Sequence, residues 1–214
     1  MRKIFPIIFL VLAACTFGRD NAVSIVSERL QDAGDAWSVE VTYPQVRGLK
    51  PQALEKLNAN LKDVVDTAVS AFMRNANAAA RANSGKEQST LRITFVPATV
   101  SDTIVSVIFT VSERLAGAAH TNEYYLTSNQ DVVRGASFSL RGIVQNEASG
   151  RMKLGSFAGM ELSRDLLDAP FTVEQNDIVL WLGIPESGED AQVRIPKNAL
   201  IPVLNEHGRE LFEH

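Results

Sequence analysis

A scarcity of cysteine is the first constraint on this chain, whose 214 residues include a single one at position 15. A disulfide joins two cysteines, so no internal disulfide holds the fold together and packing must do so. The same count excludes a zinc site built on several cysteine thiolates. With three histidines and no Gly-x-Ser-x-Gly turn, the chain also offers little material for a hydrolytic triad.

Positive charge is scarce as well, with 21 Lys and Arg residues against 25 Asp and Glu residues. No basic cluster stands out along the chain, so the surface that neutralises phosphates in nucleic-acid complexes is missing. The glycines are scattered and match no nucleotide-binding fingerprint. We therefore expect neither a nucleic-acid partner nor a cofactor.

The first fifteen residues, by contrast, carry a strong pattern. Two cations open the chain, an apolar run covers Ile4 to Leu12, and Leu12-Ala13-Ala14-Cys15 follows. This is the layout of a secretory signal, and its end resembles the bacterial lipobox. The resemblance implies cleavage between Ala14 and Cys15 and attachment of a diacylglycerol to Cys15. The alternatives are an ordinary secretory signal and an uncleaved span, although this apolar run is shorter than the ~20 residues that a span needs.

Lipidation would decide where the protein resides. Two or more acyl chains give stable anchoring, whereas one chain gives only reversible binding. We therefore expect the chain to be held at a membrane through a lipid anchor on Cys15, in a bacterial cell envelope and facing the periplasm. Thr16, rather than an aspartate, follows the cysteine, which favours the outer membrane over the inner one.

The pattern divides the chain into three predicted parts: a signal peptide over residues 1–14, a lipidated tether over residues 15–35, and a single domain over residues 36–214. The tether is polar and weakly patterned, although Ile25, Val26 and Leu30 allow a short helix or an early strand. Removing the signal peptide takes away two basic residues, which leaves 19 against 25 acidic residues and a net charge of −6. The mature chain is long enough to bury a real core.

Alternation of apolar and polar residues predicts strands in this domain. The clearest runs from Trp37 to Tyr43, and Pro44 should then end pairing within the sheet because proline donates no backbone hydrogen bond. Further strands are expected over residues 91–95, 103–111, 120–127, 171–173, 178–182 and 192–195.

One long helix is predicted from Pro51, because a proline fits the first turn, where its missing N–H costs nothing. Apolar residues recur at gaps of three and four as far as Phe72, with charged residues opposite. We expect the helix to fray over residues 75–81. Short helices are expected over residues 137–167, interrupted at Ser149-Gly150, and over residues 200–211. The elements together indicate an α+β domain, with a largely antiparallel sheet packed against one long amphipathic helix and several short helices.

Four local patterns occur in order along the predicted domain: Val41-Thr-Tyr-Pro44, Gly117-Ala-Ala-His120-Thr-Asn122, Phe171-x-Val-x-x-x-x-Ile178-Val-Leu and Val193-Arg-Ile-Pro196. Over about residues 37–204 they resemble the domain of unknown function found outside the membrane in the lysozyme-sensing anti-sigma-V factor (RsiV) and beside the catalytic module of the peptidoglycan deacetylase PdaC. The resemblance implies a non-catalytic module that binds a lysozyme-like protein or a peptidoglycan fragment. Two departures bear on this: Ala118 stands where the family has a second glycine, and residues 184–190 replace a longer aromatic segment.

Four residues are candidates for contacting such a ligand: His120, Asn122, Tyr125 and Trp181. His120 and Asn122 lie in the most distinctive pattern, and each also fits a structural role as a hydrogen-bonding residue near the start of a strand. Tyr125 and Trp181 are the better candidates for surface contact, whereas Trp37 and Tyr124 are expected to pack in the core or in cross-strand pairs. We predict no catalytic residue.

The end of the chain carries a spacing typical of metal ligands. His207, Glu210 and His214 would share one face of a helix, and imidazole and carboxylate are ordinary zinc ligands. Gly208 weakens such a helix, however, and His214 is the last residue, where chains fray. We therefore predict no metal site.

These patterns together predict an envelope lipoprotein with a binding module and without enzymatic activity. One alternative is an assembly or structural lipoprotein that contacts another envelope protein through a sheet edge or exposed aromatic residues. The other is a wall-acting hydrolase that uses His120 as its base.

Overall fold

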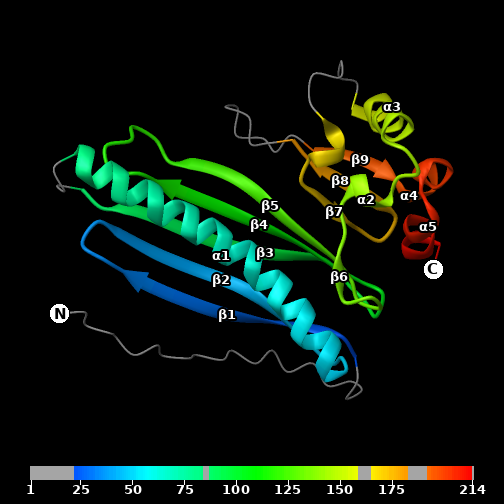
Figure 1. Cartoon of the computed structure of the whole chain (residues 1–214), viewed down its shortest axis with the longest axis horizontal. Helices are drawn as coiled ribbons and strands as arrows, with labels where there is room; N and C mark the ends of the chain where they lie inside the picture. Colours follow the sequence, from blue (N-terminus) through cyan, green and yellow to red (C-terminus); the bar gives the residue numbers. More distant parts are fainter. Residues whose placement is uncertain (1–21, 84–86, 159–164, 183–191, 214) are drawn as a thin grey trace.

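The structure, a computed structural model, describes residues 22–83, 87–158, 165–182 and 192–213. The predicted cleavage and lipidation at Ala14 and Cys15, and the shortened segment 184–190, lie outside these residues. The described part is a single α+β domain, as predicted. It contains a six-stranded sheet, a long helix that crosses this sheet, and a smaller three-stranded sheet with short helices around it (Figure 1).

The strands of the large sheet follow chain order from one edge to the other: β1 (Ser24–Ala33), β2 (Trp37–Arg47), β3 (Ser89–Val100), β4 (Ile104–Arg114), β5 (Asn122–Asp131) and β6 (Ala136–Ser137). Neighbouring strands are antiparallel except β2 and β3. That pair is parallel because helix α1 (Pro51–Ala82) connects its strands, and a parallel connection needs such a crossover. The predicted largely antiparallel sheet is confirmed.

Helix α1 lies across one face of the large sheet (Figure 1). It has Pro51 in its first turn, as predicted, and continues without interruption to Ala82. The predicted fraying from residue 75 is wrong, because Ala76 is fully buried and packs the late turns against the sheet. The apolar stripe of α1 and the facing residues of the strands form the first hydrophobic core.

Residues 24–33 form the edge strand β1, so the early strand considered for Ile25, Val26 and Leu30 is present, and it lies within the stretch that was predicted as a tether over residues 15–35. All ten residues pair with β2. Ile25 and Leu30 pack against the first core, and the Tyr43 hydroxyl donates a 2.7 Å hydrogen bond to Glu28. Most of the other side chains of β1 are exposed, which explains why its sequence pattern is weak.

The end of β2 is held by α1 rather than by β3. Pairing between β2 and β3 stops at Val41, as expected ahead of Pro44, while pairing with β1 continues past the proline. Beyond that point the Asn58 side chain accepts a hydrogen bond from the Val46 N–H at 2.7 Å and donates one to the Val46 carbonyl at 3.2 Å. One side chain of the helix thus replaces a neighbouring strand.

The smaller sheet is antiparallel and has the strand order β7 (Phe171–Val173), β8 (Asp177–Trp181) and β9 (Gln192–Pro196). The short helices near it are α2 (Leu140–Ile143), α3 (Glu147–Ala158), η1 (Leu166–Asp168), α4 (Lys197–Leu200), η2 (Ile201–Val203) and α5 (Glu206–Phe212). Their apolar side chains and those of the small sheet form a second hydrophobic core.

Two of these helices differ from the sequence expectation. Helix α3 runs through Ser149-Gly150 instead of stopping there. Gly150 is buried, and a Cβ at this position would lie 3.0 Å from a methyl group of Val144, so the glycine permits close packing rather than a break. The helix expected over residues 200–211 is divided into pieces, because Asn205 starts a new helix by accepting a hydrogen bond from the Gly208 N–H.

Side chains of the large sheet, rather than another strand, satisfy the outer backbone groups of β7. The Phe171 N–H donates to Thr127 Oγ1 at 3.2 Å, and the Phe171 carbonyl accepts from Asn129 Nδ2 at 2.8 Å. Both partners belong to β5. The first residue of β7 is therefore fixed to β5 at both of its backbone polar groups.

The last residue of β7 is held in the same way. The Val173 N–H donates to Ser106 Oγ at 2.9 Å, and its carbonyl accepts from Thr99 Oγ1 at 2.6 Å. Val105, next to Ser106 on β4, packs in the first core beneath α1. Successive residues of a strand point to opposite faces, so the small sheet meets the face of the large sheet opposite α1.

Candidate functional site

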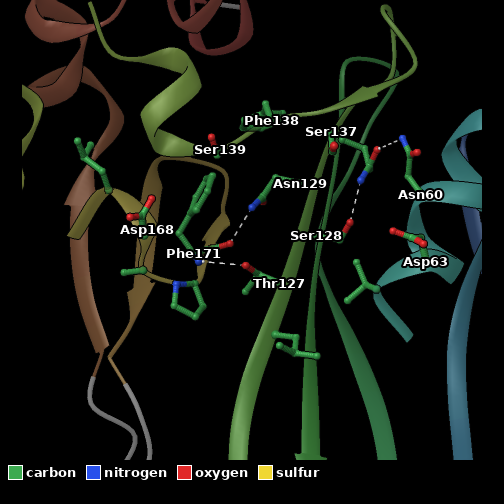
Figure 2. Close-up of a pocket in the computed structure, with 16 residues that line it drawn as sticks. Asn60, Asp63, Thr127, Ser128, Asn129, Ser137, Phe138, Ser139, Asp168 and Phe171 are labelled. Carbon is green, nitrogen blue, oxygen red and sulfur yellow. Dashed lines mark hydrogen bonds between the residues drawn. The ribbon is translucent and has the colours of Figure 1, made fainter. Parts of the chain in front are cut away.

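A groove follows the outer edge of β5, with α1 on one side and the segment Asp168–Phe171 on the other (Figure 2). A cavity of about 500 Å³ lies over the later part of the strand. A second cavity of about 410 Å³ lies beside Tyr124 and Tyr125 at the earlier part. Asp168, Ala169 and Pro170 line both cavities, so the two are neighbours along β5. We call them together the β5 groove.

The lining of the larger cavity is rich in uncharged polar side chains. These are the amides and hydroxyls of Asn60, Thr127, Ser128, Asn129, Gln130, Ser137 and Ser139. Two carboxylates, Asp63 and Asp168, are the charged groups of this cavity, and neither cavity is lined by a lysine or arginine among the described residues. The groove therefore offers many hydrogen-bonding groups in an acidic setting.

Internal hydrogen bonds fix several of these side chains in place. Asn60 Nδ2 of α1 donates to Gln130 Oε1 at 2.9 Å, and Gln130 Nε2 donates to Ser128 Oγ at 2.8 Å (Figure 2). The hydroxyls of Ser128 and Thr127 act as acceptors in these contacts, so each keeps its proton as a donor. A lining that is ordered in advance loses less entropy when a ligand binds.

An aromatic pair forms the wall of the smaller cavity. The rings of Tyr125 on β5 and Trp181 on β8 lie 4.8 Å apart between centroids, at an interplanar angle of 59°. Trp181 Nε1 donates to Thr172 Oγ1 at 3.0 Å, which fixes the indole ring. Both aromatic side chains are partly exposed. Two of the four predicted contact residues, from different sheets, are thus brought together.

The other two predicted contact residues do not line the groove. His120 is exposed just before β5 begins, and none of the described residues forms a hydrogen bond with its ring. Asn122 is exposed at the first position of β5, where its amide donates to Glu113 Oε1 at 3.4 Å across the strand pair. The hydrogen-bonding role considered for Asn122 fits this contact, whereas the His120 ring makes no such contact with the described residues.

The carboxylates at the η1 side of the groove are paired with arginine. Arg141 Nη2 lies 2.7 Å from both Asp165 Oδ2 and Asp168 Oδ2, and Arg151 Nη2 also lies 2.7 Å from Asp165. Desolvation opposes ionisation of Asp165, but hydrogen bonds from Arg141 and the Leu167 N–H outweigh it and hold its pKa below the ordinary value. Hydrogen bonds to its carboxylate partners, Asp168 first, raise the pKa of Arg141.

Asp63 differs from these carboxylates. It is exposed on α1, it points toward β5 (Figure 2), and no described residue forms an ion pair or hydrogen bond with it. Among the described lining residues, it is therefore the carboxylate whose charge has no compensating arginine. This places a strong hydrogen-bond acceptor on the α1 side of the groove.

The predicted metal-like spacing is used for other contacts. His207 Nε2 lies 2.9 Å from Asp131 Oδ2, and Glu210 accepts a 2.6 Å hydrogen bond from Arg134. His214 lies outside the described residues. Within the described ranges, no group of three or more His, Cys, Asp or Glu side chains is arranged to hold a metal ion.

Sequence reasoning missed most of the groove. It singled out Tyr125 and Trp181, but none of the amides and hydroxyls. The available signal was the polar run Ser128-Asn-Gln-Asp131 directly after the apolar part of a predicted strand. All four of these residues are buried, and the first three line the groove.

No protein-family model and no curated protein matches this chain. Two crystal structures of DUF3298 family proteins, a domain family of unknown function, are similar to it. The protein from Bacteroides fragilis NCTC 9343 is 10% identical with a TM-score of 0.60, and the match covers 91% of this chain and 98% of that chain. The protein from Pseudomonas aeruginosa PAO1 is 12% identical with a TM-score of 0.54, covering 87% and 95%. At these identities the likeness shows a shared fold.

Proposed function

We propose that this protein is a lipoprotein of the bacterial cell envelope whose domain is a non-catalytic recognition module, and that the β5 groove binds a fragment of peptidoglycan. The observation that carries the ligand proposal is the Tyr125–Trp181 pair beside a cavity lined by amides and hydroxyls. Sugar rings present an apolar C–H face for stacking and hydroxyls for hydrogen bonding. The groove supplies a partner for each of these features.

The sequence resemblance to the RsiV and PdaC domain supports the same class of ligand. Its most distinctive stretch, Gly117 to Asn122, lies outside the groove. Gly117 has a φ of 81° and a Cβ there would lie 2.7 Å from the Asn83 side chain, so this glycine shapes the β4–β5 connection. That stretch therefore supports a fold shared with the RsiV and PdaC domain, whereas the support for the proposed ligand comes from the lining of the β5 groove.

A lysozyme-like protein is the second candidate ligand. Many lysozymes are cationic, and this chain is acidic overall, with a carboxylate in the groove, Asp63, that no described residue pairs with. Attraction between opposite charges speeds the encounter of two proteins, and added salt weakens this attraction. Hydrolysis has less support, because no histidine lines the groove among the described residues and His120 lies apart from it.

Calorimetric titration of the protein with soluble peptidoglycan fragments and with lysozyme tests this proposal. Saturable binding of the fragments is expected, and Trp181→Ala should weaken it at least tenfold, equivalent to about 1.4 kcal/mol. Phe157→Ala is the matched control, since Phe157 is an exposed aromatic residue on α3 that does not line the groove. Equal binding by both variants, or no heat with either ligand, would contradict the proposal.

The anchor is tested separately. Cells expressing the full chain are labelled with a radioactive fatty acid, and label should be incorporated through Cys15. Cys15→Ala should abolish the label and release the protein from the membrane fraction. None of the described helices is long and apolar enough to cross a bilayer. Label that persists in Cys15→Ala would contradict the lipid anchor.

A further inference from the structure

We infer that the β5 groove binds the glycan strand of peptidoglycan, along at least two consecutive sugars, rather than its stem peptides. The inference rests on the proposed function and narrows it to one chemical part of the ligand. Three properties of the groove carry it: its length, its charge, and the different chemistry of its two cavities.

The groove is longer than one sugar ring. Its floor runs from Tyr124 in the smaller cavity to Gln130 in the larger one. At ~3.4 Å per residue this part of β5 is about 20 Å long. Asp168, Ala169 and Pro170 line both cavities, so one wall is continuous across the junction. A linear chain of sugars can occupy this length, whereas a single ring would fill one cavity.

The charge of the groove disfavours stem peptides. These peptides carry free carboxylates, and their recognition calls for arginine, lysine or a group of backbone N–H donors. The described lining contains neither arginine nor lysine, and its carboxylates are Asp63, Asp165 and Asp168. A ligand carboxylate would meet like charge at Asp63. N-acetylglucosamine is neutral, and the lactyl carboxyl of N-acetylmuramic acid is an amide where a stem peptide is attached, so these sugar units of the glycan bring no carboxylate of their own to Asp63.

The two cavities of the groove match two features of an amino-sugar chain. At one end the Tyr125–Trp181 pair offers partly exposed ring faces for stacking on a sugar. In the adjoining larger cavity, about the middle of the floor, the hydroxyls of Thr127 and Ser128 keep a proton to donate, for example to an acetamido carbonyl. Asp63 accepts hydrogen bonds from sugar hydroxyls on the α1 side.

The test uses the full-length protein in detergent micelles and three probes: the monomer, dimer and tetramer of N-acetylglucosamine. Calorimetry should show affinity that rises at least tenfold from monomer to dimer or tetramer. Asp63→Asn should weaken tetramer binding about threefold to tenfold. Glu55→Gln should leave it unchanged, because Glu55 is an exposed carboxylate of the same helix that does not line the groove. Asp63 is exposed, and no described residue forms a hydrogen bond or ion pair with it, so Asp63→Asn is expected to leave the fold intact, and circular dichroism of the variant checks this.

A fourth probe, the free stem peptide, separates the possible failures. Binding of the peptide without binding of the sugar chains would overturn this inference and leave the proposed function in place. Binding of intact peptidoglycan fragments that does not respond to Asp63→Asn or Trp181→Ala would also overturn it. If neither sugars, stem peptide nor intact fragments bind, the proposed function itself fails.

Discussion

Replacing Ser106 with alanine tests how the two sheets are joined. Ser106 is fully buried on β4, donates a 2.6 Å hydrogen bond to Asn129 Oδ1 and accepts one of 2.9 Å from the Val173 N–H. Alanine removes both contacts and leaves two buried polar groups without these partners. Each such group costs about 1–3 kcal/mol, so Ser106→Ala should lower the free energy of unfolding by roughly 2–6 kcal/mol.

Urea unfolding followed by circular dichroism measures this loss. The midpoint should fall while the slope with denaturant stays unchanged, because the surface exposed on unfolding is nearly the same. Ser27→Ala is the matched control, since Ser27 is an exposed serine on the edge strand β1, and it should change stability by less than about 0.5 kcal/mol. A loss below about 1 kcal/mol in Ser106→Ala would refute the view that these side-chain contacts hold β7 in place.

Three further predictions concern other contacts. Asn58→Ala removes both hydrogen bonds to Val46 and should cost about 1–3 kcal/mol in urea unfolding; a loss equal to that of the exposed Asn75→Ala would contradict this. Gly208→Ala would place a Cβ 2.6 Å from the Ile143 carbonyl oxygen, whereas in Gly142→Ala the nearest atom to the new Cβ, Ser139 Oγ, is 3.4 Å away. The melting temperature of the Gly208→Ala protein should therefore fall well below that of the Gly142→Ala protein. Burial opposes ionisation of Asp131, but hydrogen bonds from the Arg134 backbone, His207 and the Arg134 side chain keep its pKa below the ordinary 3.8. Its stabilising contribution is therefore present above pH 3.8 and is lost as the pH falls through the lower folded pKa. Unfolding measured against pH should show the stability difference between the native protein and Asp131→Asn shrinking in acid, and a difference independent of pH would count against it.

The parts of the fold that sequence predicted well are those that bury one regular face. Helix α1 has an apolar stripe that meets the sheet, so the period of its apolar residues predicted the helix as far as Phe72, although it did not predict the late turns that continue to Ala82. Strand β4, with its mostly buried residues, was equally clear. The edge strand β1 was predicted only as one of two alternatives, because few of its residues are buried and its alternation is weak.

The joint between the two sheets could not be predicted from the pattern of apolar residues. Ser106 and Asn129 are polar residues in strands, and such residues usually mark a face turned toward solvent. Here they are buried because no strand of the described residues lies at the outer side of β7, which takes hydrogen bonds from these side chains instead. The burial of these two side chains depends on contacts between residues about 40 to 70 positions apart in the chain. The local periodicity of a sequence contains no information on such distant contacts.

The candidate site was predictable only in its aromatic part. Tyr125 and Trp181 were selected separately because each is large and lies on the less buried face of its strand. That they form one pair follows from the packing of the small sheet against the large one, which no local pattern encodes. The role of Asp63 was likewise hidden, because a charged residue on the polar face of a helix looks the same whether or not it lines a groove.

The fluorescence of Trp181 tests most directly whether the β5 groove binds the peptidoglycan glycan. The chain contains two tryptophans, so a Trp37→Phe variant reports from Trp181 alone. This variant is titrated with the N-acetylglucosamine tetramer, with sucrose as an unrelated sugar. The account predicts a saturable change in the Trp181 emission with the tetramer and none with sucrose. An emission that stays constant, while calorimetry shows the tetramer bound, would place the ligand elsewhere and contradict the account.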